Sequence, residues 1–197
     1  MTRLLRLYLI SRRAPLALIV IAASAMVLYA VVRWLPDVQP LIQTVGMITS
    51  LGAAAAIGAT LWSPIGEVEQ VAGGRLPALR TATTVFLLIA ATLVLAVAGR
   101  HLPGGTLPLL RHLFGLTGIT LISAVLLGAR QCWVLPLAYT LVCARAFELS
   151  WTSLWVWPTR TAHDLAAASV ATALLAVGLL ITTLSPSTRW ESARRLQ

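Results

Sequence analysis

Two ionisable residues stand within one apolar stretch of the sequence, where a charge must either serve a function or be paired. Arg145 and Glu148 interrupt the stretch 133–157 in mid-helix and are three residues apart, so on a helix they share a face. A charge at the centre of a membrane helix costs about 2.5–3.5 kcal/mol, and we therefore expect both side chains to face the interior of a bundle. The pair serves either a translocation pathway or helix packing, with Arg111 and His112 as further members. The sequence leaves both roles open.

A second group of polar residues lies in the segment 63–80, between two apolar stretches. Pro64 suits the first turn of a helix, and Glu67 and Glu69 follow where negative charge interacts favourably with the helix dipole. A Gly-Gly pair ends such a helix, and Pro77 then marks a loop before the next apolar stretch. The pattern predicts a short cytoplasmic helix. It either docks onto a partner protein or only connects two spans.

The other patterns that would indicate catalysis or metal binding are missing from the sequence. All 15 basic residues are arginine, so the chain has no P-loop lysine and no lysine for Schiff-base chemistry. Cys132 and Cys143 lack the spacing of metal ligands, and we expect two free thiols. Neither a Gly-x-Ser-x-Gly turn nor a His-Glu-x-x-His motif occurs. We therefore expect no catalytic residue, metal or cofactor in this chain.

The composition requires a bilayer around these residues. Hydrophobic residues make up 58% of the 197-residue chain and charged residues 11%, whereas soluble domains carry about 25% charged residues. A membrane helix needs about 20 apolar residues, and six stretches qualify: 14–35, 41–62, 81–101, 106–128, 133–157 and 166–185. We expect an all-α, polytopic protein with six transmembrane helices, forming a single transmembrane domain over 1–197. Small residues in 41–62 and in Ala166–Ala173 permit close helix packing.

The distribution of arginines predicts the orientation of these spans, because cytoplasmic loops are enriched in basic residues. With both termini inside, ten of the 15 arginines are cytoplasmic, namely Arg3, Arg6, Arg12, Arg13, Arg75, Arg80, Arg130, Arg189, Arg194 and Arg195. Arg33, Arg100 and Arg160 then face outward. Tryptophans agree with this assignment if they lie at headgroup level, with Trp62 and Trp133 inside and Trp34 and Trp157 outside. The net charge of +9 then belongs to loops, and no nucleic-acid partner is expected.

The first 13 residues alternate arginine with leucine and isoleucine. Arg3, Arg6 and Arg13 share one face of a helix, which predicts an interfacial helix over 1–13 beside anionic headgroups. An ordinary positive flank of the first span is the alternative. The stretch 11–16 is partly similar to a twin-arginine signal, but its apolar run continues to Val32 and further spans follow, which argues against cleavage.

The order of these elements resembles the membrane subunits of type-2 ABC exporters, the ABC-2 permeases. The resemblance covers the whole chain in architecture, and the phrases Trp62–Glu69 and Arg75–Arg80 in pattern. In that family the cytoplasmic helix between the second and third spans couples the permease to its ATPase. The resemblance implies this role for Gly66, Glu67, Glu69 and Arg75. The family's longer outer-leaflet hairpin has little room here, in residues 151–164.

The resemblance implies a permease subunit of an ABC-type exporter in a bacterial plasma membrane. Its partners would be a cytoplasmic P-loop ATPase that holds the ATP-Mg, a second permease subunit, identical or different, and the lipid bilayer. The first alternative is a membrane scaffold or regulatory subunit that transports nothing and docks through the segment 63–80. The second is an intramembrane enzyme acting on lipid, whose activity would depend on Glu148 or His112.

Overall fold

A computed structural model describes residues 9, 11–35, 38–62, 75–102, 104–149, 153–161 and 163–184. The described chain is helical and contains no strand, which confirms the all-α prediction. The long helices are α2 (Ala14–Trp34), α3 (Gln39–Ala59), α5 (Arg75–Ala98), α6 (Leu107–Leu126), α7 (Val134–Glu148) and α8 (Leu165–Leu184). Three short 3-10 helices follow α5, α6 and α7 in turn: η1 (Gly99–His101), η2 (Ala129–Gln131) and η3 (Leu154–Thr159).

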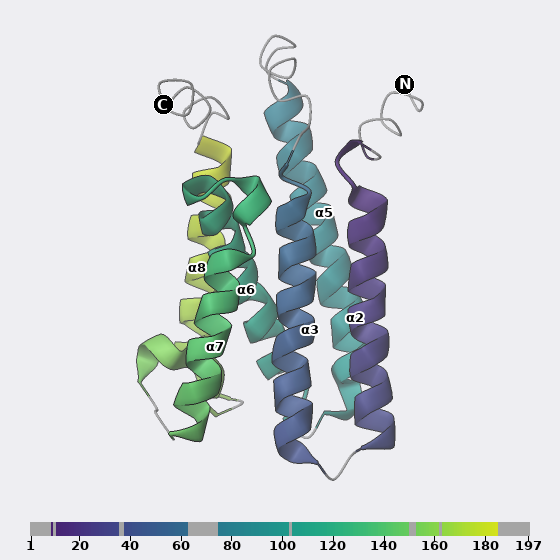
Figure 1. The fold of residues 1–197 in the computed structure, drawn as a ribbon, viewed down its shortest axis with the longest axis vertical. Helices are drawn as coiled ribbons and strands as arrows, with labels where there is room; N and C mark the ends of the chain where they lie inside the picture. The colour runs from purple at the N-terminus through teal and green to yellow at the C-terminus, as the bar shows by residue number, and fades with distance from the viewer. Residues whose placement is uncertain are drawn as a thin grey trace.

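The helices run up and down in one bundle with two ends (Figure 1). We call the end where α2 begins and α3 finishes the Trp62 end, and the end that carries η1 and η3 the η3 end. Five described helices, α2, α3, α5, α6 and α8, are long and apolar enough to cross a membrane. The architecture is therefore compatible with a multi-pass membrane protein.

Two predicted boundaries are wrong. The span expected over 133–157 ends as α7 at Glu148, after 15 residues, or about 22 Å against the ~30 Å of a bilayer core. The remainder includes η3, in which Val156 leaves helical geometry. At the other boundary, α5 begins at Arg75, so Pro77 lies in a first helical turn, where its missing N–H costs little.

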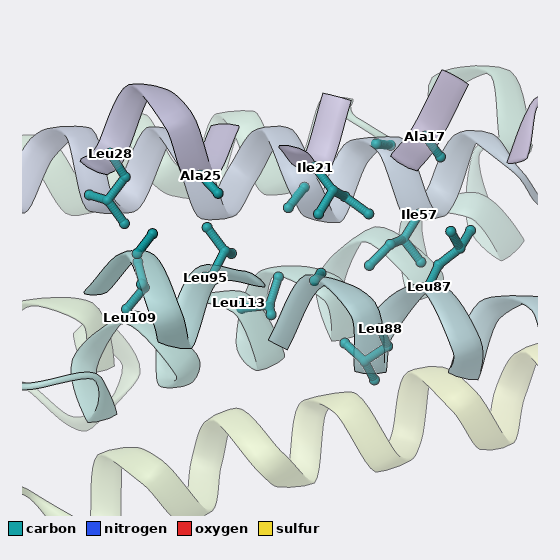
Figure 2. Packing of buried hydrophobic residues seen from close by; sticks show 14 of the residues in the cluster. Ala17, Ile21, Ala25, Leu28, Ile57, Leu87, Leu88, Leu95, Leu109 and Leu113 are labelled. Atoms are coloured by element: carbon teal, nitrogen blue, oxygen red, sulfur yellow. The ribbon is translucent and has the colours of Figure 1, made fainter. Parts of the chain in front are cut away.

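The main core is a layer of leucine, isoleucine and alanine between α2, α3, α5 and α6. Along α2 the buried residues recur every three or four positions, as on one face of a helix: Ala14, Ala17, Ile21, Ala25, Leu28 and Val32. Figure 2 shows this face of α2 directed towards Leu87 and Leu95 of α5 and Leu113 of α6. The opposite faces of α2 and α5 expose large apolar residues, as expected of helices in lipid.

In the described chain, α6 and α8 are in direct backbone contact through glycines. A Cβ atom added at Gly118 would overlap the backbone of Leu174 in α8. In the other direction, a Cβ at Gly178 would lie 2.8 Å from the carbonyl oxygen of Gly118. The two backbones thus touch without side chains between them, which only small residues permit.

We predict that Gly118→Ala lowers thermal stability, because a methyl group forced between two backbones costs about 1–3 kcal/mol. The matched control is Gly46→Ala in α3, where the added Cβ would lie 3.7 Å from Leu109 Cδ1, an ordinary contact. Thermal unfolding of both purified variants in detergent measures the difference. Equal melting temperatures for the two variants would contradict the close α6–α8 contact.

Candidate functional site

The segment between α7 and α8 is held to the bundle by one arginine of α6. The guanidinium of Arg111 donates from Nη1 to the carbonyl oxygen of Thr161 and from Nη2 to that of Arg160, each over 2.9 Å. The Arg111 side chain is buried, with 3% of the residue exposed. A planar guanidinium suits this task because it presents its donors as a rigid fork. Arg111 therefore fixes the backbone that follows η3.

Trp157 of η3 turns into the bundle and fills a space that a glycine leaves open. The residue is 1% exposed, and a Cβ on Gly115 of α6 would overlap its ring. The rings of His112 and Tyr139 lie on it with centroids 5.9 Å away in each case. His112 Nε2 also lies 3.3 Å from the carbonyl oxygen of Pro158. The ring of Trp157 is thus covered by protein, because η3 folds back against α6.

The chain then enters α8 through an acidic cap. Asp164 Oδ1 accepts from the backbone N–H groups of Ala166 and Ala167, over 2.9 and 3.2 Å. Its Oδ2 lies 2.7 Å from Arg160 Nη1 in an ion pair. Aspartate is a preferred N-cap because its oxygen satisfies N–H groups that have no helical partner. Arg160 and these two N–H groups hold the pKa of Asp164 below its usual 3.8.

A cleft of about 840 Å³ opens at the η3 end, between α3 and the wall formed by α6 and η3. We call it the η3 cleft; its polar side chains are Gln43, Thr44, Arg111, His112, Thr159, Arg160 and Thr161. No carboxylate of the described chain lines it. The rest of the lining is mainly apolar, so the cleft combines an apolar wall with hydrogen-bond donors and positive charge, which suits an amphipathic anion. No cluster of three metal-ligating side chains occurs in the described part of the chain.

Two members of the predicted intramembrane group lie side by side at one cleft in the described chain. Arg111 and His112 both line the η3 cleft. Arg145 does not, and it is exposed in the last turn of α7, so the expected mid-helix, inward-facing position is wrong. A long arginine near a helix end reaches polar surroundings without entering the core. Glu148 ends α7, and its side chain lies outside the described atoms.

The predicted coupling residues lie mostly outside the described chain. This applies to Gly66, Glu67 and Glu69, to the helix expected around them, and to most of the interfacial helix expected over 1–13. Arg75 is described by its backbone alone, as the first residue of α5. It lies at the Trp62 end, opposite the η3 cleft (Figure 1).

Sequence reasoning missed the residues that shape the site most, Gly115, Trp157 and Asp164. Two of them carried a signal. Asp164 directly precedes an apolar run, which is the pattern of an N-cap, and Gly115 and Gly118 are three residues apart, on one helix face. Nothing in the sequence pairs Trp157 with Gly115, since 42 positions separate them.

Comparison with protein-family models, curated proteins and solved structures finds no match to this chain.

We predict that Arg111→Lys destabilises the protein by about 1.5–3 kcal/mol, the range of a hydrogen bond to a charged group. A lysine is a point charge on a flexible stem and does not replace a fork that spans two carbonyl oxygens. Thermal unfolding measures the loss, and hydrogen exchange should show faster opening over 153–161. Arg100→Lys, at an exposed arginine of η1, is the control and should behave as wild type.

We predict a pH dependence at the start of α8 that originates in Asp164. Because folding lowers the pKa of this carboxyl group, its contribution is complete above the usual value of 3.8 and is lost as pH falls through the lower, folded value. Protection of the Ala166 and Ala167 amides should therefore weaken in acid. Asp164→Asn still caps the helix but does not titrate, so its protection should be independent of pH. A wild-type pH profile in that variant would assign the effect elsewhere.

Proposed function

We propose that this chain is the membrane-spanning permease subunit of an ABC-type exporter, working with a separate P-loop ATPase and a second permease subunit. Two features support the proposal. The described chain is a bundle of apolar helices with a cleft at one end that is lined in part by polar and basic side chains. The connection between α3 and α5, which carries the predicted coupling residues, joins helices at the other end (Figure 1). Substrate contact and ATPase contact would thus be at opposite membrane surfaces.

The η3 cleft is the observation that carries this proposal. The cleft, of about 840 Å³, has a mainly apolar lining that carries a few polar and basic side chains, a combination typical of small-molecule binding sites. Its positive lining suits an anionic or amphipathic substrate. Arg160 is partly neutralised by Asp164 at 2.7 Å, which leaves Arg111 as the main charge, with His112 and Gln43 as nearby polar groups.

The orientation in this proposal places the Trp62 end in the cytoplasm. Arg12, Arg13, Arg80 and Arg130 belong to that end, in keeping with the positive-inside rule. α7, with η3 folded back beside it, would make the sixth crossing. Both termini would then be cytoplasmic.

We predict that Glu67→Ala combined with Glu69→Ala uncouples ATP hydrolysis from export while the permease still assembles. The reason is that these carboxylates would contact the ATPase. Purification of the tagged protein in mild detergent should recover a P-loop ATPase in stoichiometric amounts from wild type, and less from the double variant. Asp37→Ala, which removes a carboxylate from the sequence between α2 and α3, is the control. Full transport by the double variant would contradict the coupling role.

A scaffold or regulatory subunit is the rival function, and one observation favours it. Arg111 donates to backbone carbonyl groups and His112 lies beside another, so both residues have structural partners. Thr44→Trp separates the two functions, because Thr44 is exposed and lines the η3 cleft. In a permease it should slow ATP turnover of the assembled complex in proteoliposomes. In a scaffold it should have no more effect than Leu41→Trp, which is also exposed on α3 but outside the cleft.

A further inference from the structure

A second hollow, of about 740 Å³, lies at the Trp62 end and combines an apolar floor with a basic rim. We call it the Trp62 groove. Its floor is the second half of α3, from Gly52 to Ala59, and its walls are the first turns of α2 on one side and the η2 region on the other. Figure 1 shows α2 and η2 on opposite sides of this part of α3.

The rim carries two arginines and two tryptophans. Arg13 and Arg130 are both exposed, and both line the groove together with Trp62 and Trp133. The guanidinium carbon of Arg13 lies 5.0 Å from the centroid of the Trp62 ring, a cation–π contact that holds the arginine at the rim. Arg13 also has a left-handed backbone, with φ 56°, which few residues other than glycine adopt. Such a conformation persists only where the surrounding structure maintains it.

Arg12, the residue before Arg13, does not line the groove. Arg12 is buried and donates to the two carbonyl groups that follow α3, those of Thr60 and Leu61, over 3.4 and 3.3 Å. These bonds complete the end of α3 without involving Arg13. Arg12 thus bonds to the backbone that follows α3, whereas Arg13 lines the groove.

The floor continues into the part of the bundle that lies in the membrane. Gly52 and Ala59 are about 10 Å apart along α3, and Leu16 and Val20 of α2 accompany them. All four lie within helices that are apolar enough to span a bilayer. A hydrophilic peptide would gain nothing at that depth, whereas a hydrocarbon chain would. A ligand that matches this groove has a negatively charged group for the basic rim and a hydrocarbon chain for the apolar floor.

We propose that the Trp62 groove binds an anionic glycerophospholipid, with its phosphate between Arg13 and Arg130 and one acyl chain along α3. Tryptophan at the rim agrees with this position, because indole rings concentrate at headgroup level. The site is independent of the proposed transport function, since it lies at the other end of the bundle from the η3 cleft.

The test is a titration of the delipidated protein with phosphatidylglycerol or phosphatidylcholine, followed by native mass spectrometry. Wild type should bind one phosphatidylglycerol in preference to phosphatidylcholine. Arg13→Gln combined with Arg130→Gln should weaken that binding roughly tenfold or more, given the usual strength of basic contacts with anionic lipid. The control is Arg33→Gln with Arg100→Gln, which removes the same charge from exposed positions at the η3 end and should bind as wild type.

A second pair of variants tests the floor without altering charge. Ala59→Phe places a ring in the groove at an exposed position and should reduce lipid binding, while Ala23→Phe, exposed on α2 outside the groove, should not. Equal affinity for the two lipids, or equal loss in both double-arginine variants, would overturn the proposal. If binding does not depend on Arg13 and Arg130 but tightens in E67Q/E69Q, the chain's own acidic segment occupies the groove instead.

Discussion

The need to satisfy backbone polar groups in apolar surroundings controls the architecture of this protein. In hydrocarbon, non-helical backbone is tolerated only where protein covers it and supplies hydrogen bonds. Arg111 does this for the two carbonyl groups that follow η3, and Arg12 does it for the two that follow α3. Both arginines are buried. The two guanidinium groups thus permit the chain to leave helical geometry at opposite ends of the bundle.

Helices satisfy their own backbone groups, whereas the segments after η3 and α3 need a distant arginine. This difference explains which predictions from the sequence were right. Long apolar runs are recognisable because each spanning helix satisfies its own backbone, so length and composition suffice. The bounds of α2, α3, α6 and α8 agree with the expected stretches to within a few residues. The end of α7 was beyond such reasoning, because η3 depends on Arg111 and Trp157, and their partners lie 40 or more positions away in the sequence.

The sequence also predicts only part of the helix packing by small residues. The stretch Ala166–Ala173 was expected to pack closely, and Ala167 and Ala171 are indeed buried in α8. The direct backbone contact of α8 with α6, however, is made by Gly118 and Gly178, which no composition rule distinguishes from other glycines in membrane helices. These two glycines lie where α6 and α8 cross. The crossing follows from the whole bundle, and no local pattern of the sequence encodes it.

The way in which η3 is fastened has a mechanical consequence. Arg111 of α6 donates hydrogen bonds to the backbone that follows η3, and Arg160 forms an ion pair with Asp164 just before α8. Since α6 and α8 are themselves in backbone contact at Gly118 and Gly178, any sliding between the two helices would strain both fastenings at once. The two helices and η3 therefore form one cooperative unit, which loses its packing as a whole.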